Sequence, residues 1–326
     1  MPLLLREEDV RAVLTMPDLI AAMRPALVEY STGRAQQPLR TVLTIGDRQS
    51  FFASMPASLA EPSAAGSKLV TIFPSNHDRG LPSHLATIIL LDPETGALMA
   101  LLDGRYITEA RTAAVSAVSA DVLALPDAGV LAILGSGVQA RSHLEALRCV
   151  RELREVRVWS PTEAHRAAFV RDMEPLAGVP IVAATSPASA VEGADLIVTA
   201  TASTTALIGA GDVLAGAHIC AVGACRPTHC ELAASLVARA RTFVDSRIGA
   251  LAEAGDIVLA REEGAIGADH IAGELGELLA GTVAGRESRE QVTLFKSLGM
   301  AVEDIAAAHL AWSRARAAGR GQEFTL

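Results

Sequence analysis

The apolar positions in the first third of the chain change from a helical to a strand-like pattern. Between residues 1 and 35, Ile20, Met23 and Leu27 recur at helical spacing, and Pro17 stands where a helix can begin. From residue 38 to 102 the apolar residues instead form short β-rich runs bounded by turn residues. The predicted strands are 39–45, 50–55, 67–73, 84–91 and 97–102. This pattern predicts a helical segment followed by a mostly antiparallel sheet.

Beyond residue 124, apolar runs alternate with helix-compatible segments. The predicted strands are 130–134, 156–159, 181–184, 195–201, 217–223 and 242–245. Such alternation is typical of a parallel, doubly wound sheet. A last helix through Ala318 carries an apolar stripe, so it packs on the first domain or on another subunit. We expect an α/β protein: a Rossmann-type doubly wound parallel sheet domain plus a mostly antiparallel α+β domain, with a hinge at 123–129.

Length, composition and charge narrow the class of protein. The chain has 326 residues, half of them hydrophobic, which suits two domains, and the 3% of aromatic residues predict cores of Ala, Val, Leu and Ile. A net charge of −9 argues against a nucleic-acid partner. The sequence shows neither a signal peptide nor an apolar run long enough to span a membrane. We therefore expect a soluble, cytoplasmic protein that binds no nucleic acid.

Four cysteines, at positions 149, 220, 225 and 230, are too few for a disulfide framework in a chain of this size. His218 and His229 lie near three of them, so a zinc site has to be considered. Against it, Cys220 falls within an apolar strand-like run, and no C-x2-C pair is present. We predict reduced thiols and no metal.

A glycine-rich turn follows the predicted strand 130–134. Gly135 and Gly137 precede a helix-compatible segment, and Ala140 takes the third position of a dinucleotide-binding pattern. A pyrophosphate needs backbone N–H donors at a helix N-terminus, and glycines let it approach them closely. The turn therefore predicts a dinucleotide site, with a plain strand-to-helix turn as the alternative.

The residues after the second strand of this domain bear on which dinucleotide is bound. Ser160, Pro161 and Thr162 follow the strand, and no acidic residue is present to bind a ribose hydroxyl as in many NAD sites. Ser160 and Thr162 could donate to a 2′-phosphate, with Arg166 one turn further on. This composition permits NADP and favours it over NAD.

Three cations stand where a purely structural role would not place them: Arg40, Lys68 and Arg111. Lys68 lies among apolar strand residues, and taken alone it fits the solvent face of an edge strand. Thr108 is a plausible N-cap, which would put Arg111 in the first turn of a helix, against the preference of the macrodipole for anions. An arginine at that position predicts a bound anion, either a cofactor phosphate or a substrate carboxylate.

Several segments together resemble the ornithine cyclodeaminase/mu-crystallin family, and the mu-crystallin (ketimine reductase) branch most of all. The resemblance runs from about residue 37 to 310. It is carried by QPLRT at 37–41, SKLV at 67–70, PSHLAT at 82–87, RTAAVSA at 111–117, LGSGVQA at 134–140 and FKSLGMAVED at 295–304.

The resemblance implies a homodimer with two domains per subunit. Residues 1–122 together with 298–326 would form the substrate-binding and dimerisation domain, and residues 123–297 the NAD(P)-binding Rossmann domain. It also implies that Arg40 binds the substrate carboxylate, that Lys68 lies beside the reacting C=N carbon, and that Arg111 and Thr112 hold the cofactor diphosphate. Other positions that match cofactor-lining residues of the family are Ser83, His84, Val138, Gln139, Thr199, Thr201, Val222 and Ser297.

Two departures from the family pattern matter. The NADPH-using branch has Asn-Arg-Thr where this chain has Ser160-Pro161-Thr162, which weakens the expectation of NADP. The cyclodeaminase branch has an aspartate for proton transfer where this chain has Cys225, and a thiol is mostly protonated at neutral pH. The sequence therefore favours reduction of a ketimine or cyclic imine carboxylate by NAD(P)H, with ornithine cyclodeamination or non-catalytic ligand binding as alternatives. The identity of the imine stays open.

Overall fold

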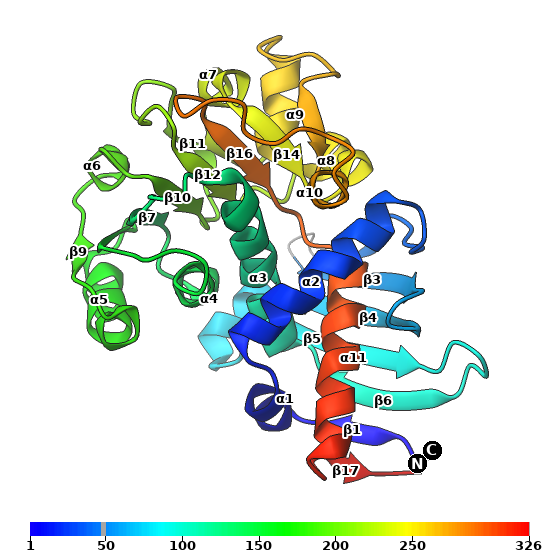
Figure 1. Cartoon of the computed structure of the whole chain (residues 1–326). Coiled ribbons are helices and arrows are strands. Elements are labelled where there is room, and N and C mark those ends of the chain that lie inside the picture. Colours follow the sequence, from blue (N-terminus) through cyan, green and yellow to red (C-terminus); the bar gives the residue numbers. More distant parts are fainter. Residues whose placement is uncertain (47–49, 326) are drawn as a thin grey trace. The chain divides into compact units, whose positions relative to one another are not determined.

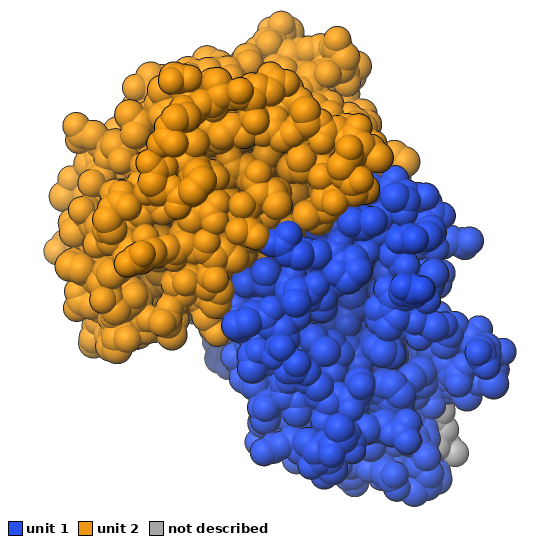
Figure 2. Space-filling view, viewed as in Figure 1, with its two compact units in different colours: residues 1–111, 300–326 blue, residues 112–299 orange. Residues whose placement is uncertain are grey.

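The computed structural model describes residues 1–46 and 50–325 and divides into two compact units. Unit 1 contains Met1–Arg111 and Met300–Leu326, and unit 2 contains Thr112–Gly299 (Figure 2). The division falls inside helix α3 (Arg105–Leu123), whereas the sequence placed it after this helix. The reason is packing, because Ala120 in the second half of α3 belongs to a core cluster of unit 2.

Unit 1 is built on a seven-stranded sheet with the order β17-β1-β6-β5-β4-β3-β2. Its strands are β1 (Leu3–Leu5), β2 (Thr41–Ile45), β3 (Ser50–Leu59), β4 (Ala64–Ile72), β5 (His84–Leu91), β6 (Leu98–Asp103) and β17 (Gln322–Glu323). Every neighbouring pair is antiparallel except β1 and β6. The sequence-based expectation of a mostly antiparallel sheet is confirmed. A 3-10 helix, η1 (Pro74–Arg79), precedes β5.

Among the described residues, unit 1 contains α1 (Glu7–Val13), α2 (Met16–Ser31), α11 (Ala301–Ala317) and the start of α3. The prediction of one helical segment over residues 1–35 was wrong at its start, because Leu3–Leu5 pair with β6 as a strand. Thr15 is the N-cap of α2, and its hydroxyl oxygen accepts a hydrogen bond from the Asp18 N–H. Helix α11 lies along the sheet and contacts β3, β4, β5 and α2 (Figure 1). Its buried face is largely alanine, which lets the helix approach the strands closely.

Unit 2 contains an eight-stranded sheet with the order β15-β14-β16-β12-β10-β7-β8-β9, in which every pair is parallel. Its strands are β7 (Val130–Leu134), β8 (Glu155–Trp159), β9 (Ile181–Ala183), β10 (Leu196–Thr199), β12 (His218–Ala221), β14 (Arg241–Val244), β15 (Ile271–Glu274) and β16 (Thr293–Lys296). Strands β11 (Thr204–Ile208) and β13 (Cys230–Leu232) form a separate pair. The predicted parallel, doubly wound sheet is therefore confirmed, and β15 and β16 were not predicted.

The helices of unit 2 cover both faces of its sheet (Figure 1). They are α4 (Val138–Leu147), α5 (Glu163–Ala177), α6 (Pro187–Val191), α7 (Ala234–Arg239), α8 (Arg247–Glu253), α9 (Gly255–Glu262) and α10 (Leu275–Leu279). Two clusters of mostly Ala, Val, Leu and Ile form the cores, as the low aromatic content predicts. In the part of the chain that the structure describes, no helix is both long and apolar enough to cross a membrane.

Candidate active site

The turn after β7 can be made only by glycine at its first position. Gly135 has a φ of +124°, which side-chain-bearing residues rarely adopt. A Cβ on Gly135 would stand 2.5 Å from the carbonyl oxygen of Ala200. The Gly135 N–H donates to the Trp159 carbonyl at 2.7 Å, so the turn is also tied to the end of β8. The first glycine therefore serves the fold.

The second glycine has a different role, because it leaves the start of α4 accessible. Gly137 is the N-cap of this helix, and no side chain caps it. A Cβ at Gly137 would meet no atom within 4 Å. The first N–H groups of α4 therefore lie where an anion could approach them, as a dinucleotide phosphate would need. Ala140 is fully buried, in agreement with a packing role for the third position of the pattern.

Four other predicted cofactor residues lie at the carboxyl edge of the same sheet. Thr199 ends β10 and Thr201 follows it, while Val222 comes directly after β12 and Ser297 directly after β16. The strand order reverses between β7 and β10, and ligands of open α/β sheets bind at such a reversal. The Ser297 hydroxyl is buried and makes no hydrogen bond within the described residues. Unit 2 thus gathers these residues around the usual dinucleotide position.

The loop after β8 is held by an arginine from α5. An Nη of Arg166 donates to the Ser160 carbonyl at 2.6 Å, and the Ser160 hydroxyl donates to the Thr162 carbonyl at 3.3 Å. The guanidinium thus lies beside the two residues predicted to meet a ribose 2′-substituent. Arg166 thus places a positive charge beside Ser160-Pro161-Thr162, the segment in which the Asn-Arg-Thr pattern has an arginine.

Unit 1 buries a group of charges that joins three of its elements. Lys68 on β4 places its Nζ 2.7 Å from Oδ2 of Asp304 on α11, and Arg111 on α3 places its Nε 2.9 Å from Oδ1 of the same carboxylate. An Nη of Arg111 also lies 2.7 Å from Glu303 Oε2. Lys68 is only 2% exposed. Since β4 lies between β3 and β5, the interpretation of Lys68 as a solvent-facing lysine on an edge strand was wrong.

Burial and neighbouring charges tune both members of the Lys68–Asp304 pair. Burial lowers the pKa of Lys68 to about 8, with the charges of Arg111 and Arg40 adding to this effect and Asp304 opposing it. Burial alone would raise the pKa of Asp304, but Arg111 and Lys68 hold that pKa below its usual range. The pair therefore offers an ammonium that can release a proton near neutral pH beside a carboxylate that stays ionised.

The reasoning that led to Arg111 needs correction. Helix α3 begins at Arg105, and the Thr108 hydroxyl donates to the Gly104 carbonyl instead of capping the helix. Arg111 therefore lies in the second turn of α3, away from the free N–H groups of the helix terminus. Its Nε and one Nη donate to the carboxylates of Asp304 and Glu303, so the structure shows Arg111 as part of a buried ion-pair group of unit 1.

Three further residues predicted for the site also belong to unit 1. Arg40 is half-buried just before β2, and its charge acts on Lys68. His84 begins β5, and burial together with the charges of Lys68 and Arg111 lowers its pKa to about 4, so its imidazole is neutral at pH 7. Ser83 is exposed beside it. Lys68, Arg111, Arg40 and His84 therefore form one electrostatic group.

Sequence reasoning missed the carboxylates that complete this group. Glu303 and Asp304 were noted within a motif without a role, yet both are fully buried in the first turn of α11. The available signal was the placement of two acids between the apolar residues Val302 and Ile305, where a buried helix face would otherwise be apolar.

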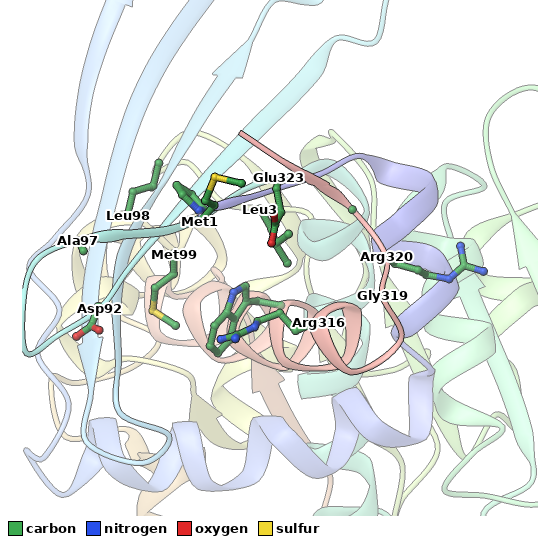
Figure 3. A pocket seen from close by; sticks show the side chains of 13 residues that line it. Met1, Leu3, Asp92, Ala97, Leu98, Met99, Arg316, Gly319, Arg320 and Glu323 are labelled. Carbon is green, nitrogen blue, oxygen red and sulfur yellow. The ribbon is translucent and has the colours of Figure 1, made fainter. Parts of the chain in front are cut away.

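A separate cavity of about 550 Å3 lies in unit 1 (Figure 3). Met99, Trp312 and Arg316 line it together with both ends of the chain, and the Arg316 guanidinium lies 5.2 Å from the centre of the Trp312 ring. Arg316 follows Asp304 by about three helical turns. None of the predicted site residues lines this cavity, so it is distinct from the group around Lys68.

The cysteines do not converge on a metal site within residues 1–46 and 50–325, where no cluster of metal-ligating side chains occurs. Cys220 is buried on β12, and burial raises the pKa of its thiol to about 12. Its neighbours are the hydroxyl of Ser119 and the ring of His218. Cys220, Ser119 and His218 therefore form a buried polar cluster beside β12.

A glycine turn before a helix, at the reversal of a parallel sheet, is the usual position of a dinucleotide cofactor, and the relatives named below are NAD(P)-dependent oxidoreductases that act on C=N bonds. Residues 1–319 match the model of the ornithine cyclodeaminase/mu-crystallin family. The chain belongs to this family, as the resemblance of its motifs implied.

Individual relatives agree with this assignment over nearly the whole chain. The ketimine reductase mu-crystallin of Mus musculus is 41% identical over 95% of this chain and 96% of its own length. The structure of Thermococcus litoralis Δ1-pyrroline-2-carboxylate reductase with NADH and L-proline has a TM-score of 0.96 and 36% identity, covering 99% of this chain and 100% of the other. An archaeal alanine dehydrogenase dimer with bound NAD has a TM-score of 0.94 and 33% identity, covering 100% and 99%.

The two glycines give a matched pair of variants. Gly137→Val should fold normally, because its side chain meets no protein atom, and should weaken NAD(P)H binding at least about a hundredfold by blocking the helix N-terminus. Gly135→Val should instead lower the melting temperature, because its Cβ meets the Ala200 carbonyl. Fluorescence titration and thermal unfolding distinguish the two effects. Unchanged cofactor affinity in folded Gly137→Val would contradict the phosphate position.

Proposed function

We propose that the protein is an NAD(P)H-dependent reductase that converts ketimine or cyclic imine carboxylates to amino acids. The observation that carries this proposal is the buried pair of Lys68 and Asp304, in which the lysine pKa lies near 8. Reduction of a C=N bond needs a proton donor beside the nitrogen, and a lysine with this pKa can provide one at neutral pH. The ketimine and pyrroline-2-carboxylate reductases among the relatives support the same reaction class.

Each substrate group has a counterpart among the residues of unit 1. Arg40 binds the carboxylate of the imine through its guanidinium. Lys68 donates a proton to the imine nitrogen, and Asp304 holds the ammonium in place and keeps it charged at neutral pH. The nicotinamide, when bound, supplies the hydride that the imine carbon receives. Addition of one hydride and one proton yields the amine without any leaving group.

The cofactor is held by residues of unit 2. Gly135, Gly137, Val138 and Gln139 form the diphosphate turn, and Thr199, Thr201, Val222 and Ser297 line the nicotinamide end. The resemblance adds Thr112 of unit 2, and Arg111, Ser83 and His84 of unit 1, to this set. Thr162 and Arg166 favour NADP, because a hydroxyl and a guanidinium suit a 2′-phosphate while no acidic residue follows β8. The predicted contribution of Ser160 is not retained, because its buried hydroxyl already donates to the Thr162 carbonyl.

Cyclodeamination of ornithine is the first alternative, and the residue at position 225 argues against it. The Cys225 thiol donates to the Val222 carbonyl at 3.0 Å, so it acts as a donor at the end of β12. A cyclodeaminase needs a carboxylate base at this position. A simple reductase acting on a preformed imine does not need one.

A non-catalytic ligand-binding protein is the second alternative. The buried Lys68 argues against it, because keeping an ammonium out of water costs several kcal/mol that binding of a small apolar ligand does not require. The charge group of unit 1 is therefore better explained by a reaction.

We also propose that the protein is a cytoplasmic homodimer formed through β2. This strand ends its sheet, and Leu39, Val42, Leu43 and Ile45 are exposed there by 41% to 56%. An exposed apolar edge strand is prone to pair, and a second copy would cover it. The dimeric archaeal alanine dehydrogenase supports this arrangement. Four free cysteines suit a reducing compartment.

Replacement of Lys68 tests its role in proton transfer. Lys68→Met should reduce imine turnover about a hundredfold or more and leave the cofactor dissociation constant nearly unchanged. The wild-type rate should fall as the pH rises through about 8, because the protonated lysine is the active form. Asp304→Asn should move this fall to lower pH, since Asp304 raises the pKa of Lys68. The exposed Arg320→Met serves as the control, and full turnover by Lys68→Met would exclude Lys68 as the proton donor.

A substrate panel tests the reaction. Pyrroline-2-carboxylate, piperideine-2-carboxylate and acyclic imines should be reduced with NADPH, and more slowly with NADH. Ornithine with NAD⁺ should release neither ammonia nor proline, because Cys225 cannot serve as the carboxylate base. Substantial ornithine turnover would establish the cyclodeaminase alternative, and binding without turnover of every compound would establish the ligand-binding one.

The oligomer is tested by placing charges on β2. Val42→Lys combined with Leu43→Lys should convert a dimer to a monomer, because two ammonium groups would have to be buried against the partner. The control is Leu214→Lys, at an exposed position of unit 2. Molar mass from light scattering gives the answer, and a dimer that survives the double substitution would place the interface elsewhere.

A further inference from the structure

A glutamate at the carboxyl edge of the parallel sheet gathers four hydrogen-bond donors. Glu231 on β13 is fully buried. Its carboxylate accepts from the Thr199 hydroxyl at 2.8 Å, from the Thr201 N–H at 2.6 Å, from the Thr201 hydroxyl at 2.7 Å and from the Gly223 N–H at 2.8 Å. Carboxylates rarely lie so deep unless their oxygens are fully hydrogen-bonded, and this one meets that condition.

The four donors come from two loops that line the proposed cofactor position. Thr199 ends β10 and Thr201 belongs to the loop after it, and Gly223 belongs to the loop after β12, the next strand in the sheet. Once a parallel strand ends, its N–H groups lose their partners in the sheet. Glu231 supplies an acceptor for the Thr201 N–H and a second acceptor for the Gly223 N–H, which also donates to the Thr199 carbonyl at 3.2 Å. It therefore bonds both loops at once.

The packing around this carboxylate leaves little freedom. A Cβ on Gly223 would stand 2.1 Å from the Thr201 carbonyl oxygen and 2.6 Å from Oε1 of Glu231. The two loops therefore meet with no room for a side chain between them. A small displacement of Glu231 would move both loops, because each is bonded to it directly.

A second buried layer holds Glu231 in place. Asp256 on α9 accepts from the backbone N–H groups of Glu231 and Leu232 at 2.8 and 3.0 Å. Its other oxygen lies 3.1 Å from Nζ of Lys296, which ends β16 and is fully buried. Burial disfavours the charged amine, yet Asp256 and other nearby groups hold the pKa of Lys296 above its usual value. The ammonium therefore balances the negative charge of this cluster.

We propose that Glu231 is a positioning residue that preorganises the loops after β10 and β12 for the nicotinamide end of the cofactor, with Asp256 and Lys296 as its support. The proposal rests on the proposed function, since it assumes that NAD(P)H binds at these loops. Glu231 acts through Thr199, Thr201 and Gly223. A role limited to filling the core would not need a carboxylate, because an apolar side chain of similar size would cost less to bury.

Glu231→Gln is the first test. A glutamine offers one carbonyl oxygen, and its amide group would face N–H donors, so the loops lose part of their anchor. The dissociation constant for NADPH should rise at least tenfold, while kcat at saturating cofactor should change less. Glu263→Gln, at an exposed glutamate of the same unit, should leave both unchanged.

A double-mutant cycle separates positioning from a merely structural effect. Thr201→Val should weaken NADPH binding in the wild-type background and should add little in the Glu231→Gln background, because both changes break the same contact. Additive effects, or an unchanged dissociation constant in folded Glu231→Gln, would overturn the proposal.

Asp256→Asn combined with Lys296→Met decides the case if Glu231→Gln does not fold. The amide oxygen at position 256 can still accept from both N–H groups, and the second change leaves no buried ammonium without its carboxylate. We expect a folded protein with a smaller but measurable loss of NADPH affinity, and wild-type affinity would overturn the proposal. All affinities are measured by NADPH fluorescence without an imine. A wild-type protein that binds NADPH but reduces no imine would therefore refute the proposed function and leave this test intact.

Discussion

The contact between Asp304 and its two cations is the interaction on which unit 1 depends. The Asp304 carboxylate binds Lys68 on β4 and Arg111 on α3. It therefore connects α11 to the sheet of unit 1 and to α3. Removing one partner of a buried ion pair costs about 3–5 kcal/mol, because the remaining charge loses its compensation. Burial lowers the pKa of this lysine and the contact with Asp304 opposes that shift, so structural integrity and proton transfer share one side chain.

Unit 2 also depends on buried carboxylates, which lie at the carboxyl edge of its sheet. There the strands end in loops whose donors need acceptors, and buried acids from β13 and α9 provide them. The start of α4 has no side-chain cap, as is also true of α5, α7 and α9, but here the N-cap is a glycine with open space around it. The protein thus satisfies its own donors where loops must be rigid and leaves a helix terminus for a ligand phosphate. This division is consistent with a site that is formed before the cofactor binds.

Local patterns were enough to predict much of the fold. Alternating apolar runs predicted most strands of both sheets, and the glycines at 135 and 137 predicted the turn after β7, because each of these signals lies within a few neighbouring residues. The N-terminal strand was missed, since three leucines fit either a helix or a strand. The N-cap assigned to Thr108 failed because helix α3 begins earlier, at Arg105.

The charge partners could not be predicted in the same way. Arg111 and Asp304 are 193 residues apart, and Glu231 and Asp256 are 25 residues apart on different elements. Nothing in the sequence pattern pairs one acid with one base when many of each are present. The family resemblance assigned a role to Lys68, but only the fold showed which carboxylate holds its ammonium.

The two buried ion pairs also account for every lysine in the chain, since Lys68 and Lys296 are the only two and all other basic side chains are arginine or histidine. Reagents that acylate ε-amines consequently find no lysine at the surface of the folded protein. Lys296 becomes reactive only when unit 2 opens, because it is fully buried and takes no part in the proposed reaction. Lys68 can in addition be reached by a small molecule that enters the proposed substrate position. The rate at which Lys296 is acylated therefore records the opening of unit 2, using a label that the native chain already carries.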